Sequence, residues 1–192
     1  MAIHSGRHQF GADRGRITLR TFRDGLAAQA GHDLTIEATR WSADLVVAQD
    51  QTPESLKVTI DLEALAVREG TGGLKPLTDR DRREIGVTAR KVLSTNRFRE
   101  ATFEATEFRP SQGNGGGGLI RGTLSLGGAS GPLDLHVSST GPGRYLATTT
   151  VRQTSFGIRP YSGFLGALKV RDTVDVEVET DLSDFQTDAG AS

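Results

Sequence analysis

The sequence predicts an all-β fold with one antiparallel sheet. Apolar and polar residues alternate with a period of two along much of the 192-residue chain, which is the pattern of strands with one buried and one solvent-facing side. Turn-forming residues separate most of these segments, and their spacing indicates about eight or nine strands. Only one stretch has a clear helical pattern, so the chain lacks the regular alternation of strands and helices that builds a parallel sheet.

The predicted strands differ in the strength of their signal. Alternation is strongest over residues 56–62, 133–138 and 174–179, and weaker over 17–19, 34–38, 43–47 and 145–151. The glycine-rich run 113–118 lies between two further alternating segments, 101–105 and 120–126. Because strand-like patterning continues on both sides, the run is predicted to be a hairpin loop rather than a linker between domains.

One helix and one short helical turn interrupt the strands. A helix is predicted over 78–93, where Thr78 or Asp79 can cap the first turn and basic residues occupy the last turn. A short helical turn is predicted over 24–30, ending at Gly31.

The length fits a single domain, which is predicted to span residues 10–183. The segments 1–9 and 184–192 are polar and aperiodic, so both are expected to be flexible termini.

Composition and charge exclude several classes of function. The chain has no cysteine, so disulfides, zinc–thiolate sites and thiol nucleophiles are impossible. Its formal net charge of −1 gives no signature of nucleic-acid binding. No apolar run reaches the length of about 18 residues that a membrane-spanning helix needs. The first residues lack the apolar stretch of a signal peptide, which favours a cytoplasmic protein.

Periodicity alone allows either a β-sandwich or a closed barrel. One Trp, two Tyr and eight Phe are few for packing an all-β interior solid. Many inward positions carry small residues, among them Ala105, Gly122 and Ala147. Small inward residues in a barrel of about eight strands leave space for one elongated ligand, which favours the barrel.

Several motifs together resemble the YceI-like family of polyisoprenoid-binding proteins, over roughly residues 10–182. Each motif is weak alone, but they follow one another in the family's order. They are Val-Thr-Ile-Asp at 58–61, Arg-Asp at 80–81, the aromatic segment 98–103, the hairpin 122–128 with the strand 132–135, Phe-Gly-Ile at 156–158, and the closing strand 170–176.

The resemblance implies an up-and-down, lipocalin-like antiparallel β-barrel of about eight strands, with the helix over one opening. It also implies a bound polyisoprenoid or quinone-like lipid, a role in binding, sequestration or transport that is linked to stress in some members, and no catalysis. The chain departs from the family at Arg99, where a proline is usual, and at Gln153, where many members carry arginine. Many members are exported.

The residues expected to bind the ligand are those predicted to point into the barrel. No catalytic residue, metal ligand or cofactor is expected beyond the lipid itself. The candidates are Leu34, Ile36, Leu45, Ile60, Phe103, Gly122, Leu124, Leu135, Phe156 and Val176.

The alternative function is a non-catalytic structural or interaction module whose barrel is filled by side chains. Such a protein would self-associate, as a homodimer for example, through the apolar loop 156–169. The same loop fits a lid over a lipid entrance.

Other candidate sites have weaker support. His32 and Asp33 could form half of a catalytic relay, but adjacent strand residues point to opposite faces. His4 and His8 have the spacing of a metal-binding pair but lie in a predicted flexible terminus. The basic cluster over 80–99 could contact a lipid head group or a partner, although interleaved acids favour a solvated face with local ion pairs.

Overall fold

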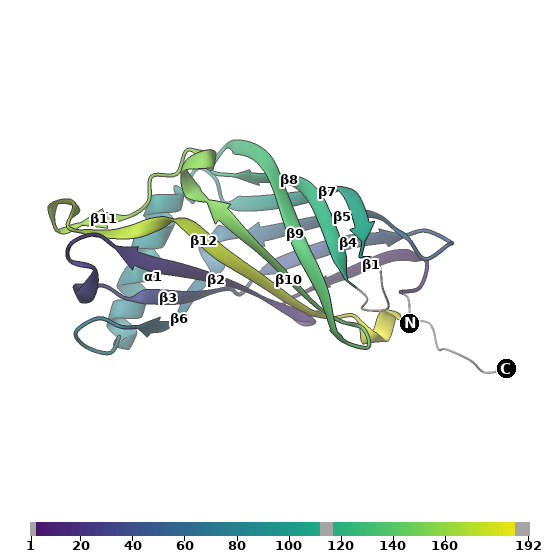
Figure 1. Ribbon diagram of the computed structural model, residues 1–192, viewed down its shortest axis with the longest axis horizontal. Helices are drawn as coiled ribbons and strands as arrows, with labels where there is room; N and C mark the ends of the chain where they lie inside the picture. The colour runs from purple at the N-terminus through teal and green to yellow at the C-terminus, as the bar shows by residue number, and fades with distance from the viewer. Residues whose placement is uncertain (1–2, 112–116, 187–192) are drawn as a thin grey trace.

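The computed structural model describes residues 3–111 and 117–186. Within these ranges, twelve strands form one antiparallel sheet (Figure 1). The hydrogen-bonded order is β1-β4-β5-β7-β8-β9-β10-β12-β2-β3-β6, with β11 beside β12. The strands are β1 (Gly6–Gly11), β2 (Gly15–Asp24), β3 (Asp33–Ala38), β4 (Trp41–Val47), β5 (Pro53–Asp61), β6 (Leu65–Thr71), β7 (Glu100–Pro110), β8 (Gly118–Leu126), β9 (Ala129–Gly141), β10 (Arg144–Arg152), β11 (Ser162–Gly163) and β12 (Leu168–Asp181).

Three pairs of consecutive strands are continuous segments with a bend. β1 and β2 are separated by residues 12–14, β3 and β4 by 39–40, and β5 and β6 by the 3₁₀ turn η2 (Leu62–Ala64). Both halves of each segment pair with the neighbouring segment, and the last segment, β12, pairs with β2. The sheet therefore curls into an up-and-down barrel of long strands, which confirms the predicted fold class and fits the expected count of about eight.

The predicted helix is present as α1 (Asp79–Leu93). Thr78 caps it: its hydroxyl accepts a hydrogen bond from the Asp81 amide, and the Asp81 carboxylate accepts one from the Thr78 amide. This reciprocal pair satisfies two amides that the first helical turn leaves without partners. The predicted turn over 24–30 is shorter than expected, since only η1 (Ala28–Ala30) is helical.

The sheet starts earlier than the predicted domain start at residue 10. Residues 6–9 form the first part of β1 and pair with β4, where a flexible terminus was expected. Apolar residues within the polar tails explain the difference. Phe10 packs edge-on against Trp41, Phe185 lies against Phe10 and His8, and Ile3 forms a bridge with Gln186.

The glycine-rich run connects two hairpin strands, as predicted. Pro110 of β7 pairs with Gly118 of β8, and the Ser111 amide donates to the Gly117 carbonyl over 2.9 Å. Residues 112–116, which include most of the run, lie outside the described residues.

Candidate functional site

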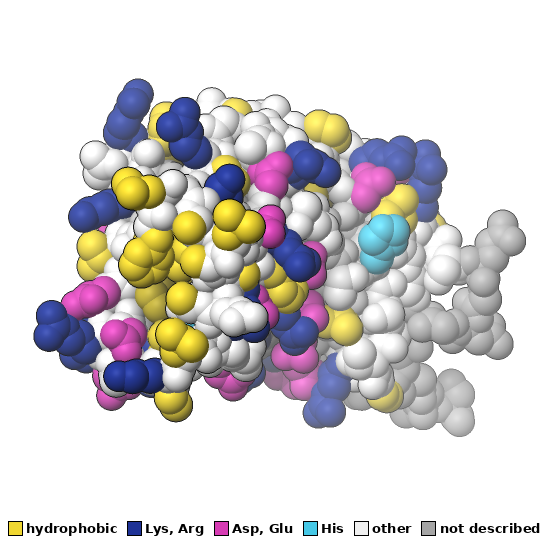
Figure 2. Space-filling view, turned by 60° about the vertical axis from the view of Figure 1, so that its left-hand side comes forward, with side chains coloured by type: hydrophobic (Ala, Val, Ile, Leu, Met, Phe, Trp, Pro, Cys, Tyr) yellow, Lys and Arg dark blue, Asp and Glu magenta, His cyan; other side chains and the backbone are white. Residues whose placement is uncertain are grey.

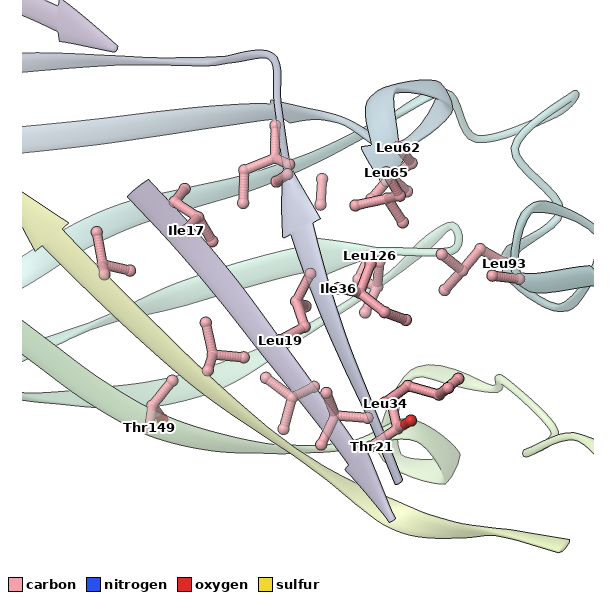
Figure 3. A pocket seen from close by; sticks show the side chains of 18 of the residues that line it. Ile17, Leu19, Thr21, Leu34, Ile36, Leu62, Leu65, Leu93, Leu126 and Thr149 are labelled. Atoms are coloured by element: carbon pink, nitrogen blue, oxygen red, sulfur yellow. The ribbon is translucent and has the colours of Figure 1, made fainter. Parts of the chain in front are cut away.

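The barrel encloses one large apolar cavity of about 1060 Å³. Figure 3 shows side chains from several strands converging on this space, among them Ile17, Leu19 and Ile36. Nearly all long strands contribute aliphatic side chains because each presents every second residue to the interior. The volume is at or above the upper end of the range of about 300–1,000 Å³ that is typical of small-molecule sites.

The cavity runs between two differently built ends. At one end, α1 covers the opening and contributes Ile85, Ala89 and Val92 to the wall (Figure 1). At the other end the wall includes Phe10 and Tyr145. Burial raises the pKa of the Tyr145 phenol above its ordinary value.

Eight of the ten predicted ligand-binding residues lie on the cavity wall. Their contact with a ligand remains a prediction, but their side chains face the required space. They are Leu34, Ile36, Leu45, Ile60, Phe103, Leu124, Leu135 and Val176.

Gly122 is not part of the wall, which corrects its assignment to the ligand site. Its strand has the predicted register, since Ile120, Leu124 and Leu126 all line the cavity. However, the ring of Phe103 on β7 lies over Gly122, and a Cβ at Gly122 would collide with that ring. The glycine accommodates a neighbouring side chain rather than a ligand.

Phe156 is also absent from the wall. It belongs to η3 (Gln153–Phe156) and is buried in a cluster with Leu124, Val151 and Ile158. Its ring thus fills space beside the cavity instead of facing a ligand. Gln153, which replaces the arginine common in the resembled family, is buried, and its amide donates to the Arg171 carbonyl over 2.9 Å.

Several wall residues were not among the ten predicted to bind the ligand. The weak alternation at 17–19 correctly indicated β2, which contributes Ile17, Leu19 and Thr21. β10 contributes Ala147 and Thr149, whose small side chains leave room in the cavity. Their alternation along the strand was visible in the sequence.

His32 and Asp33 do not form a catalytic relay. His32 Nε2 lies 2.8 Å from the Lys75 carbonyl oxygen, and the Asp33 carboxylate accepts a hydrogen bond from the Arg23 amide over 2.9 Å. The imidazole is thus held by the loop that contains Lys75, and the carboxylate by strand β2. Within the described residues no cluster of three His, Asp or Glu side chains has the arrangement of a metal site.

The basic cluster over 80–99 consists mostly of local ion pairs. Guanidinium–carboxylate distances of 2.7–3.8 Å join four of its arginines to acids on α1, η2 and β5. The pairs are Arg80–Glu84, Arg82–Asp79, Arg90–Glu63 and Arg99–Asp61. These ion pairs favour the interpretation of the cluster as a solvated surface over its interpretation as a binding site for a lipid head group.

Comparison with known proteins agrees with the fold. A family model described as the YceI-like domain matches residues 17–182. The structure of BcnA from Burkholderia cenocepacia aligns with a TM-score of 0.59 at 13% identity, over 88% of this chain and 96% of that one. A polyisoprenoid-binding domain from Saccharophagus degradans, implicated in plant cell wall breakdown, aligns with a TM-score of 0.54 at 13% identity, over 92% and 97%. No curated protein sequence matches significantly. Among the described helices, none is long and apolar enough to cross a membrane.

Proposed function

Because the chain belongs to the YceI-like family, we propose that it binds a long-chain, isoprenoid-type lipid inside its barrel and carries or sequesters it without chemical change. The observation that carries this proposal is the continuous apolar cavity, whose wall is built from aliphatic side chains. Such a wall offers few hydrogen bonds, so it suits a ligand that is recognised by apolar length rather than by polar groups.

Burial of hydrocarbon is sufficient to hold such a ligand. Each methylene transferred from water contributes about 0.8 kcal/mol. About ten buried carbons therefore give roughly 8 kcal/mol, which corresponds to a dissociation constant near 1 μM. Loss of translational and rotational freedom reduces this gain, so a longer chain is needed for tight binding.

The alternative of a barrel filled by side chains has less support. A filled interior would leave only small voids, whereas the cavity here measures about 1060 Å³. The apolar loop 156–169 still fits either an interface or a cover, because Phe164 and Leu165 in it are exposed.

Organic extraction of the purified protein followed by mass spectrometry tests the proposal. A long-chain apolar molecule should be extracted from the wild type, and Ala147→Phe should reduce its amount by filling the cavity. Leu146→Phe is the matched control, since Leu146 is adjacent on β10 and does not line the cavity.

Two results would contradict the proposal. One is a wild-type protein without any extractable apolar molecule that also fails to take up an added isoprenoid. The other is an Ala147→Phe variant that melts much lower than Leu146→Phe, since overpacking of a filled interior costs about 1–3 kcal/mol.

A further inference from the structure

The end of the barrel near α1 exposes an unusual group of large apolar side chains. Leu26 and Leu165 are fully exposed, at 101% and 109% of their reference areas, and Leu74 and Phe164 are 80% and 72% exposed. Figure 2 shows hydrophobic side chains gathered at this end of the molecule, with basic and acidic side chains at their margins. Together with Tyr161, these residues are called the mouth patch below.

The mouth patch is one surface although its residues come from three loops. The Ala27 amide donates to the Ala167 carbonyl over 2.8 Å, which joins the loop of Leu26 to that of Phe164 and Leu165. The contact between the His32 ring and the Lys75 carbonyl joins the same region to the loop of Leu74.

This surface continues directly into the cavity. Leu74, Tyr161 and Phe164 belong both to the mouth patch and to the cavity wall. An apolar molecule that enters or leaves at this end would therefore pass the mouth patch first.

Two residues of the patch have a left-handed backbone conformation. Phe164 and Leu165 have φ angles of +48° and +54°, in the left-handed region that large L-residues rarely adopt. Strained backbone that keeps apolar side chains in water is unfavourable for the isolated protein, and such strain is typical of functional loops.

An exposed apolar patch suits two kinds of occupant, a second copy of this chain or a lipid bilayer. The charges around the patch distinguish between them. The sequence contains no acid from 135 to 171. Within the described residues, Lys75, which follows Leu74, and Arg159, two residues before Tyr161, have no ion-pair partner. Three acids at this end have partners. Asp24 of β2 is opposite Lys169 of β12 and accepts a hydrogen bond from the Gly25 amide. Asp81 and Glu84 of α1, which line the cavity, bind the Thr78 amide and the Arg80 guanidinium. In a two-fold dimer formed through this patch, Lys75 and Arg159 would lie close to the same residues of the second copy. The like charges would repel one another, which disfavours the dimer.

We propose that the mouth patch docks on the surface of an anionic lipid bilayer. Leu26, Phe164 and Leu165 enter the boundary between head groups and acyl chains, while Lys75 and Arg159 contact the lipid phosphates. Docking in this orientation places the cavity opening against the hydrocarbon layer. A lipid then moves between bilayer and barrel without crossing water.

Flotation of the purified protein with vesicles tests the proposal. The vesicles contain either phosphatidylcholine alone or an equal mixture of phosphatidylcholine and phosphatidylglycerol. We expect the wild type to float with the mixed vesicles and much less with the neutral ones. Added salt should weaken the binding, because it screens charges at the membrane surface.

Two variants separate the apolar and the charged contributions. Leu165→Asn removes the apolar side chain while asparagine tolerates a positive φ, and we expect partitioning to fall about tenfold. The pair Lys75→Gln and Arg159→Gln should reduce it roughly fivefold for each charge removed. Arg7→Gln with Arg16→Gln removes the same charge from β1 and β2 and should leave binding unchanged.

Three results would overturn the proposal. The first is no flotation of the wild type with mixed vesicles, and the second is equal flotation with neutral ones. The third is a wild-type dimer in analytical ultracentrifugation that Leu165→Asn converts to a monomer, which would assign the patch to self-association. The lipid-extraction experiment is independent of these results, so failure of docking is distinguishable from failure of lipid binding.

Discussion

Gly122 provides a sharp test of the packing between β7 and β8. A Cβ at this position would lie 2.5 Å from the Glu104 carbonyl oxygen and would also collide with the Phe103 ring. The register between the two strands shifts between Ala105 and Glu107, directly beside this contact. Gly122→Ala should therefore destabilise the protein, although alanine is otherwise more favourable in a strand.

The loss of stability caused by Gly122→Ala depends on which neighbours of the new Cβ can move. The Phe103 ring can shift toward the cavity, but the Glu104 carbonyl is fixed by the sheet, so a cost near the upper part of the overpacking range, about 2–3 kcal/mol, is expected. For a chain of this size, each kcal/mol lowers the melting temperature by about 2–4 °C. Gly122→Ala should thus melt roughly 4–12 °C lower than the wild type.

Gly131→Ala on β9 is the matched control. Its Cβ would lie 3.6 Å from the Phe156 ring, an ordinary van der Waals distance, and its φ is not positive. The substitution restricts the unfolded chain and should stabilise the fold by about 0.4–1 kcal/mol.

Thermal melting followed by circular dichroism measures both variants. Two results would refute this packing: a Gly122→Ala variant that melts like the wild type, or a Gly131→Ala variant that is the less stable of the two.

Three further predictions concern the glycine-rich loop, the helix cap and the carboxylate of Asp172. Deletion of residues 113–116 should change the melting temperature by no more than about 4 °C, because loop closure depends weakly on length; a larger loss would show that the loop packs on the barrel. Thr78→Ala should cost about 1 kcal/mol through loss of the helix cap, seen as a lower urea midpoint with an unchanged slope, and an unchanged midpoint would contradict the cap's role. Hydrogen bonds from the Thr154 hydroxyl and amide lower the pKa of Asp172. Its stabilisation is therefore present above the unfolded pKa of about 3.9 and is lost as the pH falls through the lower folded value. Asp172→Asn should reduce the acid-side loss of stability in urea titrations, and a profile identical to the wild type would refute this assignment.

Local patterns in the sequence were sufficient for the features that depend on local geometry. Alternation on β8 correctly predicted that Ile120, Leu124 and Leu126 point inward, since successive strand residues must face opposite sides. The helix was predictable for a similar reason, because Thr78 and the acids after it satisfy its first turn.

Features that depend on neighbouring segments could not be predicted. Whether Gly122 faces a ligand or a side chain depends on the cross-strand position of Phe103, which no single strand encodes. The bend at η2 is another example. There the Asp61 side chain accepts a hydrogen bond from the Glu63 amide, and the Leu62 amide donates to the Arg99 carbonyl from a distant part of the chain.

The cavity itself depends on where the barrel's few aromatic residues lie. A barrel of about eight strands is just wide enough to be filled by its own side chains or to hold one ligand, so side-chain size decides the outcome. On β10 the inward residues after Tyr145 are Ala147, Thr149 and Val151, all small or β-branched. The large rings on the wall pack against neighbouring groups: Phe10 and Trp41 pack together, and Phe103 covers Gly122. The strand pattern that specifies the fold is therefore separable from the residue sizes that keep the interior open. Enlarging one residue on β10 can remove the ligand space while the alternation that folds the sheet stays intact.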